Sequence, residues 1–365
     1  MHNTRRMRIE GTYRGRRAAS IENEYLRLTV LEEGGHISEV FDKHTGINPL
    51  WTPPWPSIEH SAFNPSTHEV YGGDVESSLL SGIMGHNLCL DIFGGPSAEE
   101  AASGLPVHGE ASAVVYDLRT TDNELVMQAH LPQANLKVER WIELHDRAAR
   151  VRESVHNPKG VDHPVGWTQH VTLGPPFLKK GETLFRASVG RSRVIEKPFG
   201  AADYLQEAAE FEWPHAPRKG GGTVDLQVFT ALDVSNAYTT HLVDPQQERA
   251  FFAAFSPEFN LAFGYVWRRR DFPWLGIWEE NYSRSHAPWN RRTLTRGMEF
   301  GVSPFPESRR EMIERGPMFD TPTFRWIPAG SHLTAEYWIV SRSVRAIPET
   351  LTAFTEGSGA ATLNS

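Results

Sequence analysis

The sequence lacks the features that identify several common classes of protein. Its 365 residues contain one cysteine, Cys89, so a disulfide framework within the chain is excluded. No run of residues approaches the roughly 20 apolar residues that a membrane helix needs. The basic stretch from Met1 to Arg8 has no apolar stretch behind it, as a secretory signal would have. We therefore expect a cytoplasmic protein that does not bind membranes.

Positive charge is also scarce. The 37 basic and 45 acidic residues give a formal net charge of −8, so the broad positive field that nucleic-acid binding requires is missing. The 16 histidines form no HExxH motif, and no paired CxxC accompanies them. Phosphate-binding loops, a GxGxxG after a strand and a GxSxG elbow are absent as well. We expect no metal, no cofactor and no nucleic-acid partner.

What the sequence does contain is a long series of short strand-like segments separated by turns. Residues 25–31 and 36–42 are expected to pair as a hairpin. Only Ser97–Ala102 and Ser308–Arg315 have helical character. Because long helices with a 3.6-residue period are missing, we expect an all-β fold built as a large antiparallel β-sandwich. The further strands are expected at 113–118, 124–129, 136–144, 149–155, 224–232, 249–255, 260–267, 274–279, 296–302 and 332–341.

No internal repeat and no shift in composition marks a domain boundary. The sequence therefore predicts a polar lead-in over residues 1–20, a single β-sandwich domain over 21–345 and a C-terminal tail over 346–365. Residues 49–78 are interrupted by prolines and contain Trp51 and Trp55. The aromatic residues favour an ordered loop that walls a site.

Two histidines lie in unlike settings. His108 lies between Val107 and Gly109, where a loop is expected to lead into a strand; the alternative is an ordinary surface histidine. His170 follows Trp167 near a strand end. An aromatic ring beside a histidine suits the apolar face and the hydroxyls of a sugar, whereas the alternative is a hydrogen-bonded core histidine.

A glutamate and an aromatic segment complete the set. Glu299 lies in a strand-like run, and a position inside a concave sheet would raise its pKa toward that of a general base; otherwise it is a solvent-facing carboxylate. Trp278 and Tyr282 could wall a pocket in which Glu279 or Glu280 binds hydroxyls. Adjacent strand residues face opposite sides, so at most one of these two glutamates would point inward. The alternative here is a core aromatic cluster.

The ordered set of segments resembles the aldose 1-epimerase (galactose mutarotase-like) superfamily. Residues 106–111 resemble its first histidine motif, Gln169-His170 the second, and Met298-Glu299-Phe300 the strand that carries its catalytic glutamate. The resemblance implies a large antiparallel β-sandwich, the supersandwich of that superfamily, with a sugar on its concave face. It also implies a small-molecule sugar as the partner.

The sequence departs from this pattern at two positions. The family's arginine before the first histidine is missing, and His86, Asn87 and Asp91 are the candidates to replace it. The family's substrate-binding aspartate has no clear counterpart, since Asp225 and Asp233 match weakly. These departures leave the identity of the sugar open, and the sequence makes no prediction of the oligomeric state.

The resemblance implies an isomerase that interconverts sugar anomers by acid–base ring opening, with Glu299 as the base and His170 as the acid. Two alternatives stay open: a carbohydrate-binding protein without catalysis, and a glycoside hydrolase or lyase that pairs Glu279 or Glu280 with Glu299. The residues expected to bind the substrate are His108, Asn87, His86, Trp167, Trp278, Glu279 and Glu280.

Overall fold

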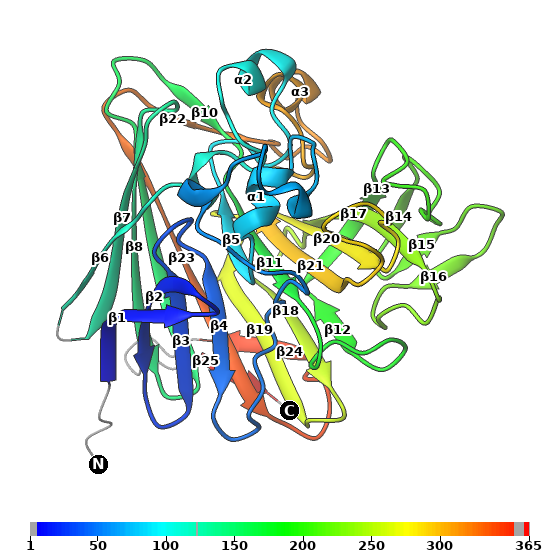
Figure 1. Ribbon diagram of the computed structural model, residues 1–365. Helices are drawn as coiled ribbons and strands as arrows, with labels where there is room; N and C mark the ends of the chain where they lie inside the picture. Colours follow the sequence, from blue (N-terminus) through cyan, green and yellow to red (C-terminus); the bar gives the residue numbers. More distant parts are fainter. Residues whose placement is uncertain (1–5, 122, 354–360, 365) are drawn as a thin grey trace.

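The computed structural model describes residues 6–121, 123–353 and 361–364, and they form an antiparallel β-sandwich (Figure 1). Within these residues the first large sheet has eleven strands. Every neighbouring pair in it is antiparallel. Their order is β1 (Arg6–Tyr13), β2 (Arg16–Glu22), β3 (Leu26–Leu31), β4 (Ile37–Asp42), β5 (His86–Cys89), β11 (Thr168–Leu173), β21 (Leu294–Gly301), β20 (Trp274–Asn281), β17 (Ser235–Val243), β13 (Val189–Val194) and β14 (Glu210–Glu212).

The second large sheet has eight strands among the described residues and packs against one face of the first. Short two-stranded sheets extend the ends of the sandwich: β10 (His163–Val165) with β22 (Arg325–Ile327), and β15 (His215–Pro217) with β16 (Thr223–Asp225). The order of the eight strands is β12 (Leu184–Ala187), β18 (Arg249–Ser256), β19 (Leu261–Arg268), β23 (His332–Ser343), β9 (Ala148–His156), β8 (Leu136–His145), β7 (Glu124–Leu131) and β6 (Asp117–Thr120).

The core between the two sheets is mainly aliphatic and aromatic, and it includes Leu28, Val138 and Phe300. It also contains a buried ion pair between adjacent strands of the second sheet, in which Arg140 of β8 donates to Glu153 of β9. Since a buried charge is tolerated only when it is paired and hydrogen-bonded, these two side chains fix one another in place.

The helices are short. The α2 helix (Ala98–Ala102) and the α3 helix (Arg309–Arg315) form in the two segments that the sequence predicts to be helical, and each begins at a capping box, on Ser97 and Ser308. The α1 helix (Ser77–Gly82) begins at the end of the loop expected over residues 49–78. The 3₁₀ turns are η1 (His60–Ala62), η2 (Glu69–Tyr71) and η3 (Glu110–Ser112). Figure 1 shows α2 and α3 at one end of the sandwich.

Several expected strands are confirmed, and others are wrong. The hairpin of β3 and β4 forms, and so do β7, β8, β9, β18, β19, β20, β21 and β23. Of residues 113–118, only Asp117 and Leu118 lie in a strand, β6, because the chain bends before them and Val115 makes a single bridge to Glu33. Residues 224–232 contribute only β16 up to Asp225.

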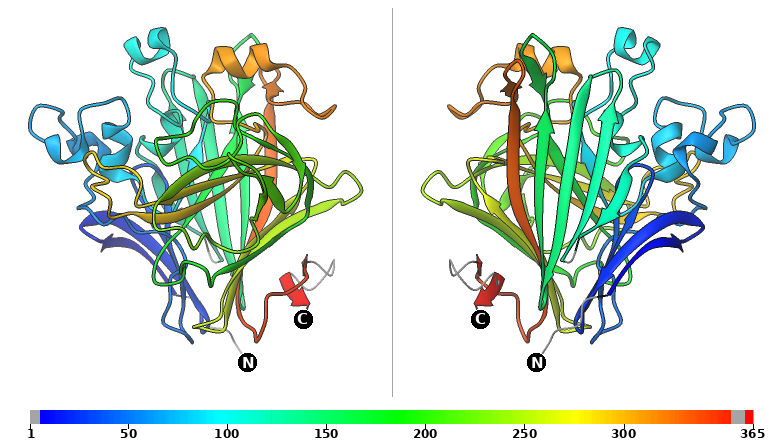
Figure 2. Two further views of the ribbon diagram at one scale, coloured as in Figure 1. Left: turned by 90° about the vertical axis from the view of Figure 1, so that its right-hand side faces the viewer. Right: turned by 90° about the vertical axis from the view of Figure 1, so that its left-hand side faces the viewer.

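The sandwich also extends beyond the limits that the sequence suggested. Strand β1 and residues 16–20 of β2 lie in the expected polar lead-in; the buried Arg16 of β2 is compensated by an ion pair with Glu59. The expected tail contains β24 (Thr350–Ala353) and β25 (Ala361–Asn364), and Leu351 packs beside Val266 and Trp338. Both views in Figure 2 show β25 at the end opposite α2 and α3. Residues 1–5, 354–360 and 365 of these segments lie outside the described residues.

Candidate functional site

The candidate site lies on the face of the first sheet that points away from the second sheet. Direct cross-strand pairing sets His170 in β11 opposite Glu299 in β21 and opposite Asn87 in β5. Directly paired residues carry their side chains on the same face. Nε2 of His170 therefore reaches Oε1 of Glu299 at 3.0 Å, and both side chains are buried.

His108 reaches the same place from a loop. Its φ of 67° is in the left-handed region, and that of Gly109 is 73°. A side chain on Gly109 would place its Cβ 2.2 Å from the carbonyl oxygen of Leu90, so only glycine fits. Nδ1 of His108 donates to the carbonyl of Phe93 at 2.5 Å. The ring centroids of His108 and His170 are 5.0 Å apart, so the loop completes a group of two imidazoles and one carboxyl.

A cavity of about 290 Å³ includes this group in its wall. Its volume is near the lower end of small-ligand sites, about 300 Å³, which suits a ligand of one ring. A larger groove of about 1040 Å³, lined by Arg17, Tyr116 and Lys137 among others, does not contact the His170–Glu299 pair. The polar side chains of the smaller cavity are Glu76, His108, His170, Arg284 and Glu299, and its rings are Phe93, Phe199, Tyr238, Trp278 and Trp289.

Burial sets the protonation of the central pair. It raises the pKa of Glu299 from 4.5 to about 8, although a hydrogen bond with Tyr238 opposes the rise. Burial, reinforced by the neighbouring His108, lowers the pKa of His170 well below 6.5. At neutral pH the pair therefore holds one acidic proton, carried by the carboxyl beside a neutral imidazole.

Arg284 lies at the cavity between two carboxylates. Its guanidinium is 3.4 Å from Glu76 and 3.5 Å from Glu280, and it stacks on Trp289 with 4.5 Å to the ring centroid. Among the described residues, the buried indole N–H groups of Trp278 and Trp289 have no hydrogen-bond acceptor. A buried donor without an acceptor is costly, so these two groups are suited to bind a polar ligand.

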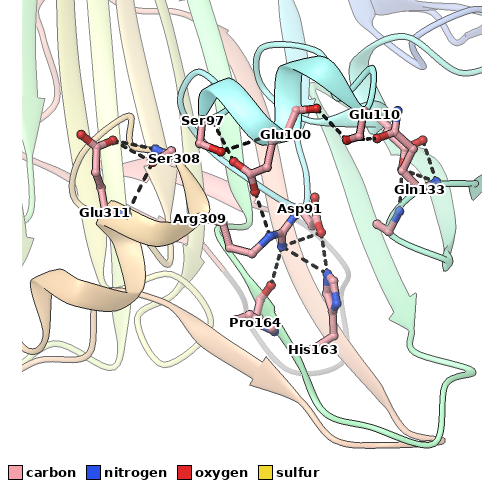
Figure 3. A network of polar contacts seen from close by, with 12 residues as sticks. Asp91, Ser97, Glu100, Glu110, Gln133, His163, Pro164, Ser308, Arg309 and Glu311 are labelled. Carbon is pink, nitrogen blue, oxygen red and sulfur yellow. Dashed lines mark hydrogen bonds and ion pairs between the residues drawn. The ribbon is translucent and has the colours of Figure 1, made fainter.

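The cavity wall near His108 is held by a network of ion pairs (Figure 3). Asp91 accepts from Nε2 of His163 at 2.5 Å and from Arg309 at 2.8 Å, and Arg309 also contacts Glu100. Burial alone would raise the pKa of Asp91, but the hydrogen bonds from His163 and Arg309 outweigh it and lower that pKa to about 2. Because Asp91 begins the loop that carries Phe93, the network supports the carbonyl that holds His108.

Neither a metal site nor a membrane span is found in the part of the chain that the structure describes. No group of three or more His, Cys, Asp or Glu side chains is placed there to hold a metal ion. No helix among these residues is long and apolar enough to cross a membrane.

No protein-family model and no curated protein matches the sequence, but solved structures resemble the fold. A Klebsiella pneumoniae protein named as a candidate aldose 1-epimerase is 12% identical with a TM-score of 0.67, over 93% of this chain and 83% of that one. A galactose mutarotase-like protein from Clostridium acetobutylicum is 11% identical with a TM-score of 0.59, over 93% and 98%. An Escherichia coli candidate aldose 1-epimerase is 12% identical with a TM-score of 0.56, over 88% and 97%.

The chain has the galactose mutarotase-like fold. On this sandwich, four residues expected from the sequence line one cavity: His108, His170, Trp278 and Glu299. Asn87 shares their face, and its amide donates to Ser112 Oγ at 3.1 Å. It lies beside His170 without lining the cavity.

Two expected residues face the other side of the galactose mutarotase-like sheet. His86 is hydrogen-bonded to Gln169 at 2.9 Å and to Tyr265 at 3.2 Å in the core between the sheets. Trp167 donates to Glu153 there and packs edge-on against Phe272. Side chains alternate along a strand, so the neighbours of site residues point away from the site. The structure therefore places His86 and Trp167 in the core between the sheets, outside the cavity.

The expected acidic residues are also engaged elsewhere. Glu279 accepts from Ser235 Oγ at 2.6 Å on the face opposite Trp278. Glu280 accepts from the backbone and hydroxyl of Ser283 and reaches the cavity only through Arg284. Asp91 belongs to the network in Figure 3. Asp225 and Asp233 are exposed and do not line the cavity.

Sequence reasoning missed Glu76, Tyr238, Arg284 and Trp289. Glu76 and Arg284 meet from loops that are 208 positions apart, so no local pattern joins them. Tyr238 lies in β17, which is buried on both faces and therefore lacks the alternation that reveals a strand. The one available signal was Trp289, a large aromatic residue in a loop that includes Pro288 and Asn290.

Proposed function

We propose that the protein is an aldose 1-epimerase, an enzyme that interconverts the two anomers of a free sugar. The observation that carries this proposal is the buried 3.0 Å contact between His170 Nε2 and Glu299 Oε1 in the wall of a cavity. An acid and a base held beside one bound molecule can transfer protons to it and from it. The galactose mutarotase-like fold supports the same proposal.

Opening a pyranose ring requires that the C1 hydroxyl lose a proton while the ring oxygen gains one. We assign Glu299 as the base that takes the hydroxyl proton and His170 as the acid that protonates the ring oxygen. The bond between C1 and the ring oxygen then breaks and leaves an open-chain aldehyde. Rotation about the C1–C2 bond and closure, with both proton transfers reversed, give the other anomer. Atoms and electrons balance without a further reactant.

The single proton of the pair is sufficient for this cycle. The resting form is a protonated Glu299 beside a neutral His170, because burial disfavours both charges. Transfer of that proton across the 3.0 Å contact gives a carboxylate and an imidazolium, which is the form that the reaction uses. Both forms contain the same number of protons, so a bound sugar can select the reactive one without exchange with solvent.

The rest of the cavity suits a sugar ring. The faces of Trp278 and Trp289 offer apolar surface for C–H groups, and their indole N–H groups offer donors for hydroxyls. Arg284, which is paired with Glu76, offers further polar contacts at the same cavity. We propose that Arg284 and the ring nitrogen Nε2 of His108 bind substrate hydroxyls. The arginine that the family resemblance led us to expect would then come from the segment after β20.

A glycoside hydrolase that pairs Glu299 with Glu279 or Glu280 is not supported, and Glu76, which also lines the cavity, is paired with Arg284. A glycoside hydrolase needs a second carboxyl group across the scissile bond from Glu299. The partners considered for that role, Glu279 and Glu280, do not line the cavity and are bound to Ser235 and Ser283.

The test is the rate of anomer interconversion, followed by polarimetry with freshly dissolved α-D-glucose and α-D-galactose. We expect the protein to exceed buffer, and Glu299→Gln and His170→Asn each to lower kcat/KM by about 10²–10⁴-fold. The matched controls are Glu139→Gln on β8 and His130→Asn on β7, which do not line the cavity and should retain the wild-type rate. Sugar binding by calorimetry with no rate above buffer would instead identify a binding protein.

A further inference from the structure

We propose that Tyr238 is a positioning residue that holds the Glu299 carboxyl toward His170. This inference rests on the proposed function, because it assigns a task to a residue beside the proposed base. Tyr238 in β17 is the direct cross-strand partner of Trp278 in β20, and both line the cavity. Its hydroxyl therefore lies on the same face of the sheet as the His170–Glu299 pair.

The side chains of Tyr238 and Glu299 share a space that exists because Gly276 has no side chain. Gly276 in β20 is the direct partner of Glu299 in β21. A Cβ on Gly276 would lie 2.1 Å from the Tyr238 hydroxyl and 3.4 Å from Oε2 of Glu299. The hydroxyl and this carboxyl oxygen therefore share the space above a residue without a side chain, and a hydrogen bond with Tyr238 lowers the pKa of Glu299.

A second glycine fixes the other end of the carboxyl. Gly297 precedes Glu299 by two positions on the same face, and a Cβ on it would lie 2.5 Å from Oε1. Oε1 is the atom that contacts Nε2 of His170. The carboxyl therefore lies along the sheet over two glycines, with Tyr238 at one oxygen and His170 at the other. Each carboxyl oxygen of Glu299 has its own partner, and the two partners together fix the orientation of the carboxyl plane.

Tyr238 is itself held rigidly. Its ring contacts those of Phe199 at 5.5 Å, Phe305 at 6.2 Å and Phe93 at 6.5 Å between centroids. The carbonyl of Pro304, 3.3 Å from its hydroxyl, competes with Glu299 for the one hydroxyl hydrogen. A hydrogen bond to an ionised acceptor is stronger than one to a neutral carbonyl. Tyr238 therefore favours the carboxylate form of Glu299, which is the form that the proposed reaction needs.

The titratable groups around Glu299 leave Tyr238 as a donor. His170 faces Glu299 from β11, Tyr238 from β17 and Cys89 from β5, while His108 contacts His170 from its loop. Burial, reinforced by Glu299, raises the pKa of both Tyr238 and Cys89 well above their ordinary values. Both stay protonated at neutral pH, so Tyr238 keeps the hydroxyl hydrogen that it can donate to the carboxylate.

The first experiment measures the pKa of Glu299 without activity. The carboxyl C=O band is followed by infrared difference spectroscopy over pH in wild type and in Tyr238→Phe, with Glu299→Gln to assign the band. Loss of a hydrogen bond to the ionised form should raise that pKa by about one unit. The matched control is Tyr265→Phe, whose hydroxyl contacts His86 on the other face of the sheet and should leave the band unchanged. An unchanged pKa in Tyr238→Phe would overturn the proposal.

The second experiment is a double-mutant cycle on kcat, measured by polarimetry. Gly276→Ala should lower kcat more than tenfold in the wild-type background, because the new Cβ displaces the Tyr238 hydroxyl. In the Tyr238→Phe background the same change should cost several-fold less, since the displaced atom is absent. Additive losses would contradict the proposed contact. A wild type with no rate above buffer would refute the proposed function, whereas the infrared shift would still decide the position of Tyr238.

Discussion

Nδ1 of His108 donates to the carbonyl of Phe93 at 2.5 Å, so Nε2 is the ring nitrogen left to accept a hydrogen bond. A neutral imidazole cannot donate from both nitrogens. The pKa of His108 is lowered by burial, which keeps the ring neutral near pH 7. His108 is therefore equipped to accept a hydrogen bond from a sugar hydroxyl and is separate in role from His170.

Replacing His108 by Phe should weaken binding more than chemistry. We expect KM to rise by about tenfold, the value of one lost hydrogen bond, with a smaller change in kcat. Steady-state polarimetry over a range of sugar concentrations separates the two parameters. A kcat as low as that of His170→Asn would show that His108 takes part in proton transfer.

The Asp91 network should control His108 from a distance. Asp91→Asn weakens the pairing with His163 and Arg309 and should lower the free energy of unfolding by about 2 kcal/mol, less than for a fully buried pair because Arg309 is partly exposed. It should also raise KM as His108→Phe does, since the Phe93 carbonyl loses its support. Denaturant unfolding and polarimetry test both effects. Glu196→Gln, in an exposed pair with Arg315, is the control and should change stability by less than about 1 kcal/mol.

The rate should fall on the alkaline side. The reactive pair holds one proton, and it loses that proton as the pH rises through the raised pKa of Glu299, about 8. Below this point the rate should be flat until His170 takes a second proton, well below pH 6.5. A pH–rate profile corrected for the buffer reaction tests this window. A rate that instead rises through pH 8 would show that Glu299 must be fully ionised.

Glu299 should also lower the free energy of unfolding at high pH. Its pKa is 4.5 unfolded and about 8 folded, so the folded state binds the proton more tightly and stability falls as pH rises between these values. Glu299→Gln lacks this dependence. Its stability relative to wild type should therefore increase by about 1–2 kcal/mol from pH 6.5 to pH 8.5. Thermal denaturation at both values measures the difference, and the Glu139→Gln control should show none.

The sequence predicts those strands of the sandwich that have one face exposed to solvent. In β8, buried and more exposed residues alternate, and that period is visible in the sequence. In β17 every residue is buried, among them the polar Thr240 and His241, so the pattern disappears. Both short helices were predicted, and the capping boxes at Ser97 and Ser308 show that their starts are set by local contacts.

The site could be predicted only in part. Side chains alternate between the two faces of a strand, but which face forms the site depends on how the strand packs in the folded protein. His86 and Asn87 are adjacent, yet one faces the core between the sheets and the other faces His170. The sequence shows that they point in opposite directions but not which direction is the site. Arg284 and Glu76 meet through loops, and loop contacts have no period to read.

The N-terminal strand pair supports a wall of the cavity that lies far from it in the chain. The buried guanidinium of Arg16 binds the carbonyl oxygens of Gly82 and Glu33, and Gly82 ends the α1 helix. Leu79 and Leu80 of that helix line the cavity. A shortened chain that begins after β2, or an Arg16→Met variant, would lose these contacts to the α1 helix. Amide hydrogens of α1 would then exchange with solvent faster than in the wild type. The variant would also bind sugar more weakly, although every acid–base group of the site is still present.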